Sequence, residues 1–468
     1  MIKNSFLNLL GLAVPIVAAL ICIPPTFSAL GSSDAGVLLL IWGLINSSAL
    51  LDFGLGRALT YSLANTGKTN SSSIIAFAFW ISLLLGIAFG ALLFIGSGSL
   101  AEHLGDPSSE AVFTALAWSI PFIINTSILR GVLEAERKFA LVNAIRIPTG
   151  ALNFVAPLLV VWVIAPDIVL VAWSLTAGRV LTFLLFLSAT LPRASSSLWR
   201  VNNLDGSRAL MIAGGWMTVS NMAGPVMNLV ERMVIGGQLS LSSVTTYATP
   251  QEFVARLAIV PNAISVALFP EVSSKNIDRD RLGYVYKNCI LTVLVLTAAP
   301  SVAVFLFAKD VLSIWIGVEF ANLAEGALQV FSIGGLIGAL AQIPFVVIQG
   351  RGGARFTGIL HIVEVAVFCI ALAVVIENWA LTGVLALWLF RVVVDAAVLF
   401  WRAQRYVSFP SATGSGSGLT LFLCTLACLP LAGVESLATR AAAVCVVVVL
   451  TIICMVSLLS LRNGTKND

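Results

Sequence analysis

The chain alternates long apolar runs with short polar interruptions from one end to the other. A helix rises 1.5 Å per residue, so about 20 apolar residues are needed to cross the hydrocarbon core of a bilayer. Runs of this length predict about fourteen helices. We place them at 7–30, 36–63, 71–97, 110–130, 139–164, 167–190, 209–236, 243–269, 284–308, 323–349, 356–376, 379–402, 417–433 and 436–460. The pattern indicates an all-α polytopic membrane protein.

Composition agrees with this fold class and excludes several functions. Hydrophobic residues make up 59% of the 468 residues, charged residues 10%, and mean hydropathy is +1.01, whereas soluble domains are about 25% charged. A net charge of +4 is too small for nucleic-acid binding. The chain has no phosphate-binding P-loop, none of its seven cysteines forms a C-x-x-C pair, and its two histidines lie far apart in sequence. We therefore expect a protein that is not an enzyme and holds no cofactor or metal.

The basic residues predict the orientation of the helices. If the N-terminus is cytoplasmic, most of the Lys and Arg residues fall in inside loops or at inside helix ends, and only Lys309 and Arg440 lie outside. The outer loop at 98–109 carries acids but no Lys or Arg. This asymmetry is the one expected of cytoplasmic loops. We expect a multi-pass protein of a cytoplasmic membrane with both termini in the cytoplasm.

A weak internal repeat predicts the domain organisation. The segment that opens the fifth helix, 137–143, resembles 354–360, which opens the eleventh. Arg179 and Arg391 then occupy matching depths in the sixth and twelfth helices. Copies that run in the same direction are related by an axis along the membrane normal. We predict an N-terminal six-helix lobe at 1–190, a cytoplasmic loop at 191–208, a C-terminal six-helix lobe at 209–405, and two further helices with a short tail at 406–468.

Charged residues within the apolar runs are the candidate functional residues, because intramembrane charge is costly and usually marks a transport path. Glu252 and Arg256 are spaced i,i+4, and so are Arg391 and Asp395, so that each pair shares one helix face. Arg179 has no acid on its own helix and must find a partner elsewhere. The remaining candidates are Asp52, Arg57 and Glu364, whereas Glu231 and Arg232 are interpreted as an interfacial pair.

These residues predict a cationic cavity between the lobes. Guanidinium groups stay charged and present a fork of donors that matches phosphate. We expect Arg57, Arg256, Arg179 and Arg391 to bind an anion such as a phosphorylated lipid head. The acids Asp52, Glu252, Asp395 and Glu364 are candidates for ion coupling or charge pairing.

Several segments carry a resemblance to a known family. They are Asn8–Pro15, Asp52–Thr60, Arg130–Phe139, Glu231–Gly236 with Tyr247 beyond it, and Val260–Pro270. With them the chain resembles, over nearly its whole length, the polysaccharide (O-antigen-type) flippases of the multidrug/oligosaccharidyl-lipid/polysaccharide exporter superfamily. The motif at 52–60 is the most specific of these segments.

The resemblance implies a V-shaped pair of six-helix lobes that works by alternating access. It implies transport of undecaprenyl-diphosphate-linked oligosaccharide from the inner to the outer leaflet of the bacterial inner membrane, coupled to H⁺ or Na⁺. The related lipid II flippases imply that Arg57 and Arg256 hold the diphosphate. The expected partners are this lipid-linked substrate, membrane lipids, and polymerase or chain-length proteins of polysaccharide assembly.

Two alternatives stay open. A multidrug or cation exporter of the same superfamily should have a cavity dominated by acids, whereas the arginines here are at least as numerous. A membrane-embedded polysaccharide polymerase should have a long outer loop with basic or catalytic residues, whereas the outer loops here are short and acidic or neutral.

Overall fold

The computed structural model describes residues 2–48, 71–136, 138–194, 207–273, 278–407 and 436–464. The chain forms two compact units, 1–245 and 246–468. Over the described residues every regular element is a helix and no strand occurs, which confirms the all-α class. Seven helical segments in this part of the chain are long and apolar enough to cross a membrane, and some contain more than one helix. The number fourteen stays a prediction, and the helix expected at 417–433 lies outside the described residues.

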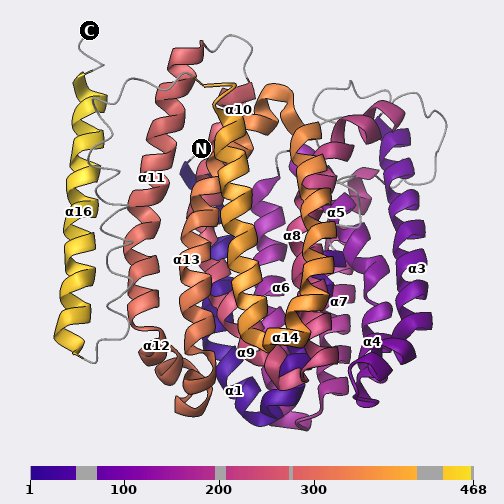
Figure 1. The fold of residues 1–468 in the computed structure, drawn as a ribbon. Coiled ribbons are helices and arrows are strands. Elements are labelled where there is room, and N and C mark those ends of the chain that lie inside the picture. The colour runs from indigo at the N-terminus through magenta and orange to yellow at the C-terminus, as the bar shows by residue number, and fades with distance from the viewer. Residues whose placement is uncertain are drawn as a thin grey trace. The chain divides into compact units, whose positions relative to one another are not determined.

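The described part of the first unit consists of helices (Figure 1). Their bounds are α1 Ile2–Ser48, α3 Ser71–His103, α4 Ser108–Ala117, α5 Ile120–Ala135, α6 Phe139–Leu159 with a π turn at Val160–Ile164, α7 Ile168–Ala194 and α8 Ser207–Gln238. The single helix expected at 110–130 is two helices in the structure, because a turn at 118–119 separates α4 from α5.

Helix α1 contains two of the expected helices, because the chain reverses direction within it. Gly31 has φ 79° and ψ 170°, which interrupts the helix. Pro15 lies against Gly150, and the ring of Trp42 lies 5.2 Å from that of Phe154, one turn further along α6. In a straight helix Pro15 and Trp42 would be about 40 Å apart. Both halves of α1 therefore pack on α6, and a glycine supplies the positive φ that the reversal requires.

The second unit is built around α13. Its elements are α9 Leu241–Ala255, which begins at the end of the first unit, a 3₁₀ turn at Arg256–Ala258, α10 Ile259–Ser273, α11 Arg279–Leu306, α12 Ala308–Trp315, α13 Val318–Ile348, a π turn at Gln349–Gly353, α14 Ala354–Ala403 and α16 Leu437–Gly464. Helix α13 packs against α10, α11, α12 and α14, and α16 packs along α11. The yellow α16 lies beside α11 in Figure 1.

Helix α14 likewise contains two expected helices, 356–376 and 379–402. The interruption is at Ala380, which has φ 47° and ψ −140°. Positive φ is uncommon for a residue with a side chain. Atoms of residues 361 and 395 lie within 4 Å of each other, so the two halves fold back on one another at Ala380. This reversal determines the geometry of the site described next.

The two compact units do not coincide with the two predicted lobes, so they do not test the lobe boundaries. Helix α8 packs against α1 and belongs to the first unit. The lobe boundaries at 190 and 209 stay a prediction.

The surfaces of the spanning segments agree with a lipid environment: Leu84, Ile87, Leu92 and Ile95 of α3 are exposed. Apolar side chains on such a surface are stable in a bilayer.

Candidate functional site

Six of the eight candidate residues can be placed. Asp52 and Arg57 lie outside the described residues. Arg179 belongs to the first unit, and the other five, Glu252, Arg256, Glu364, Arg391 and Asp395, belong to the second.

Arg179 on α7 has a neutral partner on the neighbouring helix. Its Nη2 donates to Oδ1 of Asn153 on α6 over 2.7 Å. Thr149, Ser174 and Thr182 line a hollow of about 10 Å³ beside it, close to the space that one water molecule occupies. No carboxylate pairs with Arg179 among the described residues. Its guanidinium group is thus oriented by a neutral amide.

Glu252 and Arg256 form the expected i,i+4 ion pair. Nη2 of Arg256 lies 3.1 Å from Oε2 of Glu252, and both side chains are partly buried. Arg256 begins the 3₁₀ turn that separates α9 from α10, and Pro250 and Pro261 flank this turn in sequence. A break in a membrane helix is tolerated where protein or a wet cavity satisfies the backbone. The pair lies at that break.

The reversal of α14 brings three titratable side chains together. Glu364 precedes Ala380 by 16 residues and Asp395 follows it by 15, so the two acids lie at similar depth on the two halves. His361 lies one turn from Glu364, and its Nε2 is 3.6 Å from Oδ1 of Asp395. One ligand atom from each of His361, Glu364 and Asp395 lies within 4.8 Å of the others. These three residues are called the α14 cluster below.

The partner of Asp395 differs from the expected one. Asp395 lies beside His361, whereas the guanidinium of Arg391 lies over the ring of Phe368 at 5.9 Å. Arg391 still acts electrostatically on Glu364, as do Asp395 and His361. The α14 cluster is therefore a mixed group of two acids and a histidine beside one fixed cation.

His361 was missed as a candidate because the sequence separates it from Asp395 by more than thirty residues. One signal was available: His361 and Glu364 are spaced i,i+3 and share a helix face. The ring of His361 also stacks on Phe345 of α13, with centroids 5.6 Å apart and an angle of 16° between the rings. This contact fixes the orientation of the imidazole toward the acids.

The interpretation of Glu231 and Arg232 as an interfacial pair was wrong. Both side chains are buried, with exposed fractions of 0% and 2%. Nη1 of Arg232 donates to the carbonyl oxygen of Leu39 over 3.0 Å, and Gly43 leaves room for the guanidinium. Buried charge is stable only when it is paired or hydrogen-bonded. Arg232 therefore joins α8 to α1 inside the first unit.

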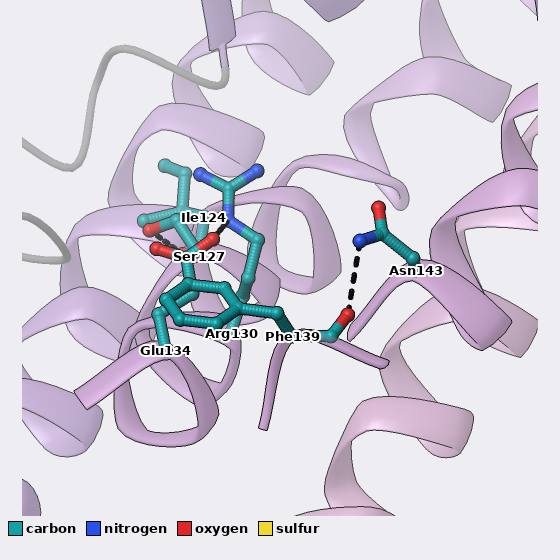
Figure 2. Close-up of polar contacts among 6 residues, drawn as sticks. All are labelled: Ile124, Ser127, Arg130, Glu134, Phe139 and Asn143. Atoms are coloured by element: carbon teal, nitrogen blue, oxygen red, sulfur yellow. Dashed lines mark hydrogen bonds and ion pairs between the residues drawn. The ribbon is translucent and has the colours of Figure 1, made fainter. Parts of the chain in front are cut away.

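The segment Arg130–Phe139 includes the last residues of α5 and the first residue of α6 (Figure 2). Arg130 and Glu134 pair over 3.5 Å on the same helix, and Nδ2 of Asn143 donates to the carbonyl oxygen of Phe139 over 2.9 Å. Ser127 donates to the carbonyl oxygen of Ile124 one turn earlier. These contacts are local, and they indicate a structural role for the segment.

The model of a family described as polysaccharide biosynthesis protein matches residues 30–325. A protein of Shigella flexneri named "Putative O-antigen transporter" is 29% identical over 416 residues, which cover 87% of this chain and 98% of that protein.

Two solved structures share the fold. The lipid II flippase MurJ in an inward closed conformation has a TM-score of 0.72 at 11% identity, and the match covers the whole of both chains. An inward-facing multidrug resistance MATE transporter has a TM-score of 0.68 at 15% identity, over 85% of this chain and 97% of that one. At such low identity these two matches support the fold alone, and they agree with the expected all-α membrane fold.

Proposed function

Because the chain belongs to the polysaccharide biosynthesis protein family, we propose that it is a flippase for an undecaprenyl-diphosphate-linked oligosaccharide. The substrate would be an O-antigen or exopolysaccharide repeat unit, moved from the inner to the outer leaflet of a bacterial cytoplasmic membrane. The observation that carries this proposal is the similarity to an O-antigen transporter along 98% of that protein's length. The relatives are named as transporters and flippases, so we treat the chain as a transporter and not as an enzyme.

Charge within the helices supports an anionic substrate. Arg179 is hydrogen-bonded to a neutral amide, and Arg256 pairs with the carboxylate of Glu252. A diphosphate offers several acceptor oxygens to such guanidinium groups. In this proposal Arg256 and Arg179 hold the diphosphate, with Arg57 and Arg391 as further contributors, while the polyprenyl chain stays in lipid. Alternating access and coupling to an ion complete the cycle.

The test is a clean deletion in the native host, with surface polysaccharide and lipid-linked intermediates measured together. We expect the polymer to disappear and the diphosphate-linked repeat unit to accumulate on the cytoplasmic face. Single repeat units that reach the surface unpolymerised would indicate a polymerase. Unchanged glycans with increased drug sensitivity would indicate a multidrug exporter.

Complementation with variants of Arg256 then tests the binding residues. We expect Arg256→Ala to reduce polymer by tenfold or more, since one hydrogen-bonded charge contributes roughly 1.5–3 kcal/mol. Arg256→Lys should restore only part of the activity, because Lys keeps the charge but lacks the planar fork. Arg355→Ala, at an exposed arginine at the start of α14, is the control. Full polymer in a stably inserted Arg256→Ala variant would remove Arg256 from the site.

A further inference from the structure

Arginine side chains gather where both ends of α14 meet the start of α11. Nη2 of Arg279, the first residue of α11, donates to the carbonyl oxygen of Arg405 over 2.9 Å. Cζ of Arg402, in the last turn of α14, lies 4.8 Å from the ring centroid of Phe356, in the first turn of the same helix. Three parts of the chain therefore meet at one end of the second unit. Arg279, Arg402 and Arg405 are called the arginine surface below.

Positive charge is in excess around the arginine surface. Two stretches that meet here, 326–363 and 396–434, contain basic residues and no Asp or Glu. The acids near this end in sequence are on α10 and at the start of α11: Glu271, Asp278 and Asp280. The carboxylate of Asp278 accepts the backbone N–H of Arg279 as the cap of α11. Among the described residues, no carboxylate forms an ion pair with any of the three arginines.

Aromatic rings hold two of these guanidinium groups at the level of the lipid head groups. Cζ of Arg405 lies 5.3 Å from the ring centroid of Trp401, and Cζ of Arg402 lies 5.8 Å from that of Tyr406. Trp401 is 54% exposed near the end of a spanning segment, and Trp and Tyr side chains in such positions lie at the membrane–water interface. Stacking on the face of a ring leaves the N–H groups at the edge of a guanidinium open to an acceptor.

We propose that Arg279, Arg402 and Arg405 bind the phosphate head group of an anionic phospholipid. The distribution of Lys and Arg predicts that this end of the unit lies in the cytoplasmic leaflet, whose anionic lipids attract basic surfaces. A phosphodiester without a neighbouring ammonium group keeps its negative charge and offers oxygen acceptors that match the guanidinium fork. The bound lipid holds the start of α11 against the two ends of α14. This site goes beyond the proposed function, because it is independent of which lipid the protein transports.

Native mass spectrometry of the purified full-length protein in detergent tests the site, with phosphatidylglycerol as the probe and phosphatidylcholine as the neutral reference. We expect the wild-type protein to bind the first phosphatidylglycerol at least tenfold more tightly than phosphatidylcholine. Arg405→Gln should weaken this binding about fivefold, and Gln at both 279 and 405 should weaken it tenfold or more. Arg279 and Arg405 are exposed, so these variants should fold. Equal affinity of the wild-type protein for the two lipids would overturn the proposal.

Two further variants separate charge at this site from general effects. Arg130→Gln is the matched control, because Arg130 is an arginine near another helix end on the same predicted side, is 44% exposed and pairs with Glu134. It should leave phosphatidylglycerol binding unchanged. Arg405→Lys should keep most of the binding, since Lys retains the positive charge. A loss in Arg405→Lys as large as in Arg405→Gln, or an equal loss in Arg130→Gln, would contradict the proposal.

Undecaprenyl diphosphate offers similar phosphate chemistry from another lipid, so its binding is measured in the same way. We expect the variant with Gln at both 279 and 405 to bind undecaprenyl diphosphate as the wild-type protein does. Loss of this binding together with unchanged phosphatidylglycerol binding would assign the arginine surface to the transported lipid and overturn the phospholipid site. None of these measurements depends on export, so their failure would leave the flippase proposal as it stands.

Discussion

Asp106 shows how one charged residue outside the apolar core can stabilise a helix. It lies in the short turn before α4, where its carboxylate accepts hydrogen bonds from the backbone N–H of Ser108 and from the hydroxyls of Ser108 and Ser109. Burial alone would raise the pKa of Asp106, but these hydrogen bonds outweigh it and hold the pKa below its ordinary value of 3.8. The negative charge at the start of α4 is also favourable for the helix dipole.

The lowered pKa predicts a loss of stability in acid. A carboxyl group with a lower pKa in the folded state stabilises that state above its unfolded pKa, and this contribution is lost as pH falls through the folded pKa. We expect Asp106→Ala to lower the free energy of unfolding of the detergent-solubilised protein by about 1 kcal/mol at neutral pH, as for other helix-capping residues. Thermal unfolding measures this change. The difference from wild type should shrink below about pH 3.8. Glu102→Gln, at an exposed acid near the end of α3, is the control; an equal loss in both variants would contradict the prediction.

Partners close in sequence were predictable, and distant ones were not. The Glu252–Arg256 pair follows from i,i+4 spacing, and the structure confirms it. The contact between His361 and Asp395 depends on the chain reversal at Ala380, which brings together residues far apart in sequence. Spacing alone suggested Arg391 as the partner of Asp395 and gave no information about the imidazole.

At the scale of elements, the second half of α1 is held tightly by its neighbours. Residues 35–41 are buried, Thr245 donates to the carbonyl oxygen of Ser32 over 2.7 Å, and Ser47 donates to the carbonyl oxygen of Pro225 over 3.1 Å. With the Arg232 contact, these bonds tie α1 to α8 and to the start of α9. This half of α1 leads directly into the segment that contains Asp52 and Arg57.

Gly36 allows the closest of these approaches. A Cβ atom at this position would lie 2.0 Å from the carbonyl oxygen of Leu241, which is backbone and cannot move aside. We expect Gly36→Ala to destabilise the first unit by about 1–3 kcal/mol or more, as overpacked interiors do. Gly338→Ala, within α13 where nothing lies within 4 Å of the added atom, is the matched control and should be neutral or slightly stabilising. Thermal unfolding in detergent measures both, and equal melting temperatures would contradict the close approach.

Element positions were largely predictable because apolar run length determines where a spanning helix forms. The runs at 209–236 and 243–269 correspond to α8 and to α9 with α10. The 3₁₀ turn at Arg256–Ala258 and the division into α4 and α5 were not anticipated. A local change in hydrogen bonding leaves the hydrophobic pattern unchanged, so periodicity does not reveal it.

At the scale of the whole molecule, the distribution of charge predicts the same orientation for both units. Each unit has a turn expected outside, at Gly105 and at Gly317, and segments expected inside, at Arg130 and at Arg279. If the predicted lobes are parallel copies, as the repeat implies, their corresponding ends face the same side of the membrane. Inverted copies would face opposite sides. The orientation of each unit is therefore a test of how the chain is organised.

Reporter fusions test this orientation one unit at a time. Alkaline phosphatase is active only outside the cytoplasm. A fluorescent protein that folds only in the cytoplasm reports the opposite location. We expect phosphatase activity for fusions after Gly105 and after Gly317, and fluorescence for fusions after Glu136 and after Asp278. The reason is that the inside segments carry the Lys and Arg residues, whereas the loop at Gly105 carries only acids. Opposite signals from the two units would mean inverted repeats, and would place Arg179 and Arg391 at unrelated depths instead of at the matched depth that supports the parallel repeat.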